Sequence, residues 1–180
     1  MSYAIIGFGK IGHALAKAFA RSGIEVTVAT TRDPKSFAPD VAAIGPKVIA
    51  KTLAEAVKAD IIFLAVHFQS HVDVAKALSS WQGKTIIDVT NAYGVPPEKL
   101  GGLPSSKFIA QAFHGARLVK GFNHLIAATL EQDPAVHGGR RVLFLASDDD
   151  GAAEQIGALA EKLGFAPVEL GGLSEGGLLV

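Results

Sequence analysis

Short apolar runs rich in β-branched residues alternate along the whole chain with segments of helical periodicity. Near-continuous apolar runs of this kind are typical of parallel strands that are buried on both faces, with helices in the connections between them. Eight runs predict strands, at Tyr3–Ile6, Glu25–Ala29, Lys47–Ala50, Ile61–Val66, Thr85–Val89, Arg117–Phe122, Arg141–Ala146 and Pro167–Glu169. The sequence therefore predicts an α/β fold with a Rossmann-type, doubly wound and mainly parallel sheet.

Helical patterns fill most of the gaps between these strands. The two clearest helices are predicted over 10–22 and 152–163, and a glycine follows each of them, as it often does at a helix end. Thr52-Leu-Ala-Glu55 has the spacing of a capping box, and Ser70-His-Val-Asp73 is a weaker version of it. Both segments follow predicted strands and should begin helices.

The length and composition favour one domain. A chain of 180 residues has room for one core and little else, and 49% hydrophobic residues exclude a solvated, disordered chain. We expect residues 1–180 to form a single nucleotide-binding domain. The glycine-rich tail, 171–180, carries four large aliphatic side chains and is expected to dock on the core or on a second subunit.

Charge and cysteine content exclude several classes of function. The 17 Lys and Arg balance the 17 Asp and Glu, so no overall field favours nucleic acid or an anionic membrane. Cysteine is absent, which excludes disulfides, thiolate nucleophiles and cysteine-ligated metal. Met1-Ser2-Tyr3 leads into a strand without the basic region of a signal peptide, and no apolar run has the length of a bilayer span. These features predict a cytoplasmic protein.

A glycine-rich turn joins the first predicted strand to the first predicted helix. It consists of Gly7, Phe8, Gly9, Lys10, Ile11 and Gly12. In this context Gly7 permits the tight turn, Gly9 lets the backbone approach a diphosphate, and Gly12 allows close helix–strand packing. The helix start adds unpaired N–H groups for an anion. A glycine-rich turn without a ligand is the alternative, but the setting favours a dinucleotide.

The end of the second strand indicates which dinucleotide. An NAD-binding unit normally places a carboxylate there, whereas this chain has Thr30, Thr31 and Arg32. Hydroxyl groups and a guanidinium suit a 2′-phosphate. Asp33 is the competing candidate, but it precedes Pro34 and fits a helix N-cap. The sequence therefore predicts NADP.

Residues just after the fourth, fifth and sixth strands are expected to surround the nicotinamide, because ligands of open α/β sheets bind at the carboxyl ends of strands. The cofactor candidates there are Val66, His67 and Asn91. The substrate candidates are Phe68, Tyr93, Phe122, Asn123 and His124. For each polar side chain, a role as a loop cap is the alternative.

The sequence assigns no catalytic residue and no metal ligand. We identify no nucleophile elbow, no carboxylate pair and no Lys–Asp relay, and His67 and His71 fall at a strand end and a helix start. Hydride transfer chiefly requires positioning, since the nicotinamide supplies the chemistry. The lack of a general acid favours an acceptor that takes the hydride into its own conjugated ring, such as a deazaflavin or a flavin.

With these motifs in order, the chain resembles the NADP oxidoreductases that depend on the deazaflavin coenzyme F-420 (F420). The broader group includes the reductase domain of ferric-reductase membrane proteins. The resemblance rests on Ile6–Gly12, Thr31-Arg32, Ala65–His67, Ile87–Asn91, Val119–Asn123 and the stretch from Gly164 to Glu175. It implies NADPH held by Gly7, Gly9, Gly12, Thr31 and Arg32, with Val66, His67 and Asn91 near the nicotinamide, and a homodimer. Related chains commonly have proline at the position of His67.

The leading hypothesis is an NADPH:deazaflavin or NADPH:flavin reductase whose acceptor is coenzyme F420, FMN or FAD. A non-catalytic NADP(H) sensor or scaffold is the alternative from a different class, because a fold alone assigns no chemistry. The nucleotide domain of a β-hydroxyacid or pyrroline-carboxylate reductase is a third possibility. It would need a helical dimerisation domain, for which 180 residues leave no room.

Overall fold

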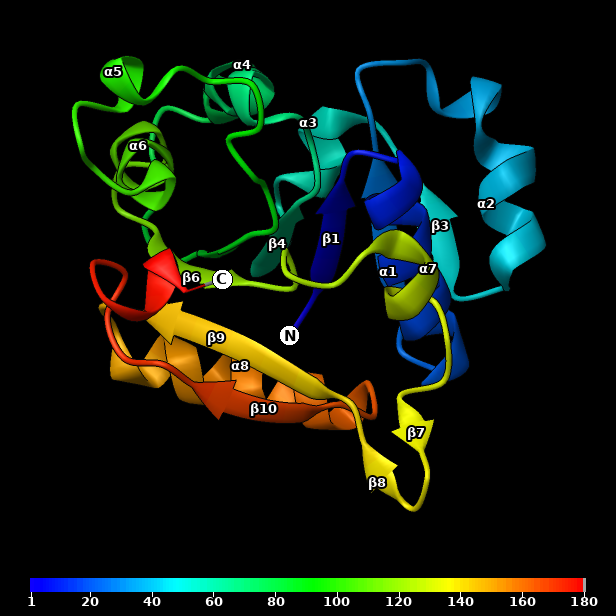
Figure 1. Cartoon of the computed structure of the whole chain (residues 1–180). Coiled ribbons are helices and arrows are strands. Elements are labelled where there is room, and N and C mark those ends of the chain that lie inside the picture. Colours follow the sequence, from blue (N-terminus) through cyan, green and yellow to red (C-terminus); the bar gives the residue numbers. More distant parts are fainter. Residues whose placement is uncertain (180) are drawn as a thin grey trace.

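The computed structural model describes residues 1–179, and it contains an eight-stranded sheet in the order β10-β9-β6-β5-β4-β1-β2-β3 (Figure 1). Its strands are β1 (Tyr3–Ile6), β2 (Val26–Ala29), β3 (Val48–Ala50), β4 (Ile61–Leu64), β5 (Thr85–Asp88), β6 (Arg117–Gly121), β9 (Val142–Ser147) and β10 (Ala166–Glu169). The first six pair in parallel, β9 pairs antiparallel with β6, and β10 runs parallel to β9. The predicted doubly wound, mainly parallel sheet is confirmed.

The chain fills one half of the sheet and then the other. From β1 it moves through β2 to β3 at one edge, and it returns to pair β4 with β1 on the other side. The carboxyl ends of β1 and β4 therefore form the switch point, where connections leave in opposite directions. In folds of this class the ligand crevice lies at that point.

Helices cover both faces of the sheet. They are α1 (Lys10–Arg21), α2 (Ala38–Ile44), α3 (Leu53–Ala56), α4 (His71–Ala75), α5 (Pro97–Leu100), α6 (Ser105–Ala112), α7 (Ala127–Leu130) and α8 (Asp150–Lys162). Short 3-10 turns are η1 (Pro34–Ser36), η2 (Phe68–Ser70) and η3 (Gly176–Leu178). The two helices predicted over 10–22 and 152–163 correspond to α1 and α8. A small hairpin of β7 (Ala135–Val136) and β8 (Gly139–Arg140) projects from the body (Figure 1).

One of the two predicted capping boxes is present. Thr52 Oγ1 accepts a hydrogen bond from Glu55 N at 3.3 Å, and Glu55 Oε2 accepts one from Thr52 N at 3.0 Å. The prediction for Ser70 is wrong, because its side chain makes no capping bond. Ser70 ends η2 with helical dihedral angles, φ −85° and ψ −6°, whereas an N-cap residue needs an extended conformation.

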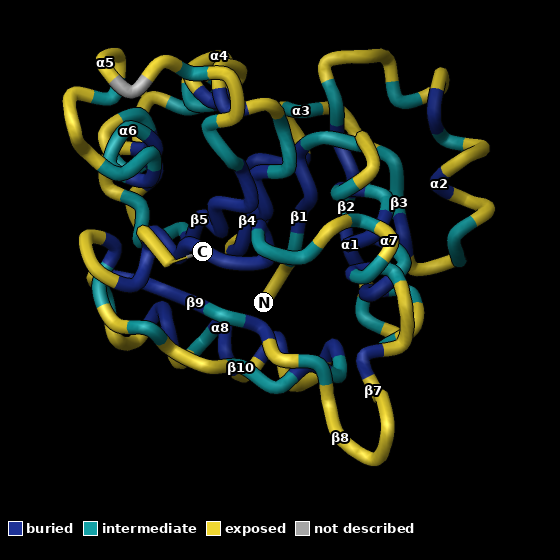
Figure 2. The backbone as a smooth tube through the Cα atoms, in the orientation of Figure 1, coloured by how far each residue is buried: buried dark blue, intermediate teal, exposed yellow. Residues whose placement is uncertain are grey.

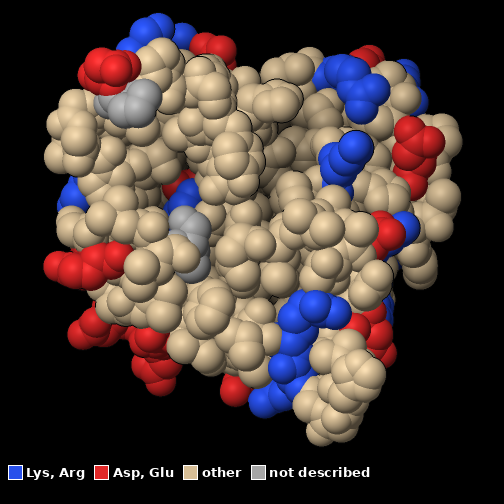
Figure 3. All heavy atoms as spheres, viewed as in Figure 1, with Lys and Arg blue, Asp and Glu red and all other residues tan. Residues whose placement is uncertain are grey.

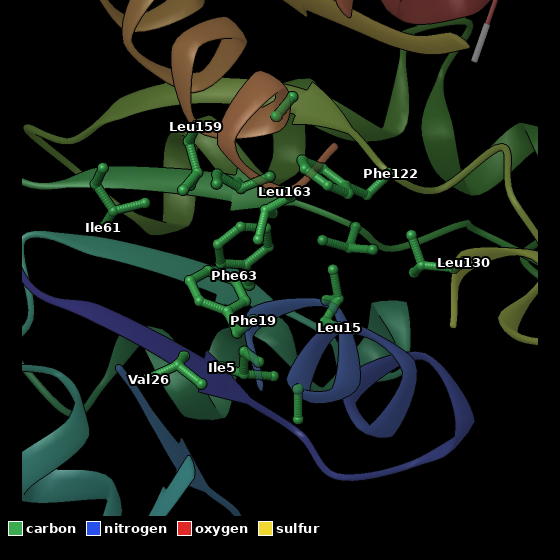
Figure 4. Packing of buried hydrophobic residues seen from close by; sticks show 14 of the residues in the cluster. Ile5, Leu15, Phe19, Val26, Ile61, Phe63, Phe122, Leu130, Leu159 and Leu163 are labelled. Carbon is green, nitrogen blue, oxygen red and sulfur yellow. The ribbon is translucent and has the colours of Figure 1, made fainter. Parts of the chain in front are cut away.

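Each face of the sheet carries its own apolar core. On the first, Phe19 of α1, Phe63 of β4 and Phe122 pack edge to face, with ring centroids 5.5 and 5.2 Å apart. Leu159 of α8 and Leu163, which directly follows that helix, close over the sheet (Figure 4). The second cluster contains Trp81 and Phe113 under α4 and α6. Alternate residues of one strand serve the two clusters, and the central strands are buried throughout (Figure 2).

The glycine-rich tail divides between core and surface. Leu173 is buried in the second cluster, whereas Leu178 and Leu179 are exposed, and Val180 lies outside the described residues. Among residues 1–179, no helix combines the length and the apolarity that a bilayer span requires.

Candidate dinucleotide-binding site

A cavity of about 680 Å³ lies where β1, β2, β4 and β5 end. Its floor and walls combine the turn between β1 and α1, the end of β2, and the segments that follow β4 and β5. The lining residues of those segments are 6–11, Thr30, Thr31, 65–67, 89–91 and Tyr93. Leu53 of α3, Ser70 of η2, and Asp73 and Val74 of α4 complete the lining. The structure thus brings segments from both halves of the sheet around one space.

The three glycines of the β1–α1 turn have different surroundings. Gly7 has φ +106°, and a Cβ atom there would lie 2.1 Å from the carbonyl oxygen of Ala65. A Cβ atom on Gly12 would lie 2.0 Å from the carbonyl oxygen of Gly7. At Gly9 a Cβ atom would meet nothing within 4 Å. Two of the glycines are therefore needed for packing, while the third leaves the backbone open toward the cavity.

The first turn of α1 offers free donors to this open space. Its N-cap residue is Gly9, which has no side chain to accept from the first N–H groups, and the first turn contains no acidic residue. Lys10 and Ile11 of the same turn line the cavity. Unpaired N–H groups and the positive end of a twelve-residue helix make this wall suitable for an anion such as a diphosphate.

The end of β2 forms a polar and positively charged corner. Thr30 and Thr31 line the cavity, and Thr30 Oγ1 accepts a hydrogen bond from Arg32 N at 3.0 Å. The Arg32 guanidinium is exposed just beyond the lining residues, 5.5 Å from the ring centre of Phe37, a cation–π contact. Lys and Arg atoms gather over the connection from β2 to α2 (Figure 3).

Asp33 acts as a helix N-cap, as its position before Pro34 predicts. Its Oδ1 accepts a hydrogen bond from Lys35 N at 2.9 Å and caps η1. This bond occupies Oδ1 of the carboxylate in the local backbone turn. The corner therefore presents hydroxyl groups and a guanidinium, which suit a 2′-phosphate.

Two asparagines meet at the opposite end of the cavity. Asn91, which lines the cavity after β5, donates from Nδ2 to the carbonyl oxygen of Asn123 at 3.0 Å and to Tyr93 Oη at 3.4 Å. Asn123 donates from its own Nδ2 to Asn91 Oδ1 at 2.9 Å. Both N–H groups of Asn91 are engaged, so its remaining capacity is that of an acceptor, for example toward an N–H of a carboxamide.

A buried ion pair lies beneath these asparagines, and sequence reasoning missed it. Lys120 Nζ is 3.1 Å from Asp88 Oδ2, and both side chains are almost completely buried. Asp88 Oδ1 accepts from Thr90 N at 2.9 Å and from Thr90 Oγ1 at 2.7 Å, and Lys120 Nζ donates to Thr90 O. Opposite charges at corresponding places in two apolar strand runs were the available sequence signal.

Several residues predicted to contact the ligand lie away from the cavity. Phe122 is fully buried in the first core, because its φ of +64° turns the ring away from the strand end. Phe68 packs in the second core against Phe108, and Asn123 stands behind Asn91. Among the substrate candidates, Tyr93 is the residue that the structure places on the cavity wall. Gly12 stands behind the turn, where it packs against Gly7.

His124 also lies elsewhere, beside β9. Its Nε2 accepts a hydrogen bond from Phe144 N at 3.5 Å, and its ring is tilted against Phe144. Burial lowers the pKa of His124, and a backbone hydrogen bond involving Val142 raises it by a smaller amount. Within residues 1–179, no three His, Asp or Glu side chains gather into a group that could hold a metal ion.

A glycine-rich turn, an uncapped helix start and a basic strand end around one cavity define a dinucleotide-binding α/β protein. A match to a known family agrees with the class of dinucleotide-binding α/β proteins and identifies one family within it. Residues 2–92 match the family described as NADP oxidoreductase, coenzyme F420-dependent. The chain belongs to this family.

Known proteins extend the likeness beyond the matched segment. The metalloreductase STEAP2 of Mus musculus is 31% identical over 175 residues, which cover 94% of this chain and 33% of that protein. The chain thus spans about a third of the length of the curated relatives it matches.

Two solved structures have closely similar folds. A hypothetical protein from Sinorhizobium meliloti is 40% identical with a TM-score of 0.93, over 98% of this chain and 88% of that one. A putative F420-dependent NADP reductase from Arthrobacter sp. FB24 is 26% identical with a TM-score of 0.78, over 96% and 86% of the two chains.

Proposed function

We propose that this protein transfers a hydride between NADPH and a deazaflavin or flavin acceptor, namely coenzyme F420, FMN or FAD. One observation carries the proposal: a single cavity joins the open start of α1, the Thr30 and Thr31 hydroxyl groups after β2, with Arg32 just beyond them, and the Asn91 side chain. These three features match, in order, a diphosphate, a 2′-phosphate and a carboxamide. All three groups are parts of NADP(H).

The residues divide between the parts of the cofactor. The backbone of Gly7–Ile11, which includes the start of α1, faces the diphosphate, and Thr30, Thr31 and Arg32 face the 2′-phosphate. Val66, His67 and Asn91 line the side where the nicotinamide lies. NADPH supplies the hydride when bound, so the protein's task is to fix its ring beside an acceptor.

The acceptor is proposed from chemistry and from the relatives together. A conjugated ring that accepts hydride does not depend on a proton donor held by the protein. The Arthrobacter protein is described as a putative F420-dependent NADP reductase, and the STEAP2 relatives are metalloreductases. A flat acceptor would enter beside Tyr93, whose exposed ring stands at the cavity wall and whose hydroxyl oxygen accepts a hydrogen bond from Asn91 Nδ2.

Spectroscopy tests the reaction directly. Purified protein is mixed with NADPH and with oxidised F420, FMN or FAD in separate cuvettes, and loss of the acceptor's visible band is followed against a sample with NADH. We expect turnover with at least one acceptor and with NADPH in preference to NADH. Tight NADPH binding without turnover of any acceptor would favour a sensor or scaffold. No calorimetric heat with NADPH or NADH would overturn the dinucleotide assignment itself.

We also propose that the protein works as a homodimer. Leu178 and Leu179 follow a buried segment of the tail yet are 64% and 76% exposed. Adjacent aliphatic side chains in water are costly, and a two-fold interface between identical chains would bury both copies. The tail then serves as part of the subunit contact.

A further inference from the structure

The buried Lys120–Asp88 pair has no part in the proposed binding of phosphate groups, and its placement points to another role. Thr85 pairs with Arg117, and Asp88 pairs with Lys120, as register partners of β5 and β6. Thr85 and Arg117 lie at the amino ends of the two strands. Asp88 and Lys120 lie at the carboxyl ends, beneath the cavity. A buried ion pair is often no more stabilising than apolar residues of the same size, so stability alone does not explain it.

The ion pair engages the backbone and the hydroxyl of one residue. Asp88 accepts from the backbone N–H and the hydroxyl of Thr90, and Lys120 donates to the Thr90 carbonyl. Thr90 is 2% exposed, so these bonds fix a buried residue just beyond the carboxyl end of β5. The next residue is Asn91, whose backbone position is therefore set by the pair.

The same strand, β6, also controls the side chain of Asn91. Two residues beyond Lys120, the left-handed conformation of Phe122, with φ +64°, buries its ring in the core and turns the chain back toward β5. That turn brings the Asn123 amide and carbonyl onto Asn91. The Asn91 side chain is thus held by hydrogen bonds from the segment that follows β6, while its backbone follows Thr90 at the end of β5.

The proposed orientation of the bound dinucleotide places its nicotinamide half, and not its adenosine half, beside Asn91. The anion site at α1 lies over β1, and the basic corner lies at β2, so the adenosine half occupies the β2 side. The other half extends toward β4 and β5, where Asn91 lies. This step rests on the proposed function.

We infer that Lys120 and Asp88 are positioning residues which, together with Asn123, hold the Asn91 side chain as a hydrogen-bond acceptor for the nicotinamide carboxamide. Their effect reaches the ligand through Thr90 and Asn91 and not by contact. The inference predicts that loss of the pair weakens binding of the nicotinamide half and leaves the adenosine half unchanged.

The test compares two ligands in two variants. Lys120→Met combined with Asp88→Asn removes both charges together, so no buried charge is left unpaired, and the side-chain carbonyl introduced by Asp88→Asn keeps an acceptor for Thr90. The matched control is Arg117→Met, which removes a cation from the same strand. Arg117 donates to Thr85 Oγ1 at 2.8 Å and to Gln155 Oε1 at 3.1 Å, at the opposite end of β6.

Calorimetry then measures NADPH against 2′-phospho-ADP-ribose, which lacks the nicotinamide. We expect the double variant to bind NADPH about tenfold more weakly, the loss of about one hydrogen bond, and the fragment within about twofold of the wild type. Arg117→Met should change neither affinity by more than about twofold. Equal losses for the two ligands in the double variant, or unchanged NADPH binding, would overturn the inference.

A ligand-free measurement separates this inference from the proposed function. Hydrogen exchange of the Asn91 side-chain amide, followed by NMR, should be slow in the wild type and faster in the double variant. Asn123→Ala, which leaves the ion pair intact, should accelerate it as well. Unchanged exchange in a folded double variant contradicts the inference, whatever the ligand. Slow wild-type exchange with no NADPH binding would instead contradict the proposed function.

Discussion

Gly9 and Gly12 belong to the same turn, but they constrain different properties of the protein. Gly12 packs its α-carbon against the carbonyl of Gly7, where a methyl group would lie 2.0 Å from the oxygen. Gly9 has φ −80° and ψ −165°, which any residue adopts, and open space in front of it. One position is limited by packing, and the other by what must come close to the backbone.

Substitution of Gly12 should therefore affect stability, and substitution of Gly9 should affect cofactor binding. Gly12→Ala should lower the free energy of unfolding by about 1–3 kcal/mol, the usual cost of overpacking. Gly9→Ala should leave stability within about 0.5 kcal/mol, as surface substitutions do, and should weaken NADPH binding about tenfold or more, because its methyl group occupies the place of the diphosphate. Urea unfolding and calorimetry on both variants measure the two effects. Normal NADPH affinity in Gly9→Ala would show that no diphosphate approaches this turn.

Arg32 is expected to determine the preference between the two nicotinamide cofactors. Its guanidinium is exposed over Phe37, and Asp33, the nearest alternative ligand for a ribose, caps η1. A charge-assisted hydrogen bond contributes about 1.5–3 kcal/mol, so Arg32→Ala should weaken NADPH binding about tenfold to a hundredfold with little change for NADH. Arg140→Ala, an exposed arginine on the β7–β8 hairpin, is the control for a general charge effect. Equal losses for both cofactors would remove the 2′-phosphate assignment.

Sequence reasoning identified the local features of the site better than its long-range ones. The glycine turn, the hydroxyl groups after β2 and the Asp33 cap are each contained within a few consecutive residues, and the structure places them as expected. The Asn91–Asn123 and Asp88–Lys120 pairs each join residues 32 positions apart, so their contacts depend on strand pairing. Phe122 was placed at the site because it follows a strand, but its positive φ turns it into the core.

Among the elements, the parallel strands were predictable because the apolar runs are short and bounded by clear turn signals. The antiparallel pairing of β9 with β6 was not predictable in the same way, since a buried strand has the same composition in either direction. The β7–β8 hairpin consists of two-residue exposed strands and carries no apolar alternation. Elements without a buried face leave no periodic signal in the sequence.

The contact between the loop after β6 and strand β9 should make stability depend on pH through His124. Burial holds its pKa below the ordinary value of 6.5. Above pH 6.5 the imidazole is neutral in both the folded and unfolded chain. As the pH falls below 6.5 the unfolded chain binds a proton that the folded chain does not, so stability decreases until the pH passes the folded pKa.

The measurement is the urea midpoint between pH 5 and 8 for the wild type and for His124→Gln, which cannot be protonated. The difference between the two proteins isolates His124 from the carboxylates, and the lowered pKa values of Glu55, Asp60 and Asp73 lie below this range. We expect the wild type to lose stability relative to the variant as the pH falls. Parallel curves for the two proteins would show that β9 does not bury this imidazole.

The order of the strands in the sheet determines which part of the cofactor each half of the cavity faces. The side of β2 and β3 carries the basic corner, and the side of β4 and β5 carries the asparagines, with the start of α1 between them. The net charge of zero gives no general attraction for anions, so the phosphate groups depend on these local donors. Cofactor binding should therefore be sensitive to single residues and less so to the overall charge.

The proposed homodimer can be tested through the two exposed leucines of the tail. If Leu178 and Leu179 lie in the interface, Leu178→Ser combined with Leu179→Ser should give a monomer of 18.7 kDa under conditions in which the wild type sediments as a dimer. Ile126→Ser is the control, because Ile126 is similarly exposed, at 70%, but belongs to the segment after β6. A monomeric wild type would contradict the homodimer. A double variant that stays dimeric would place the subunit contact on another surface, since two serines would not hold an interface that depends on the burial of leucine.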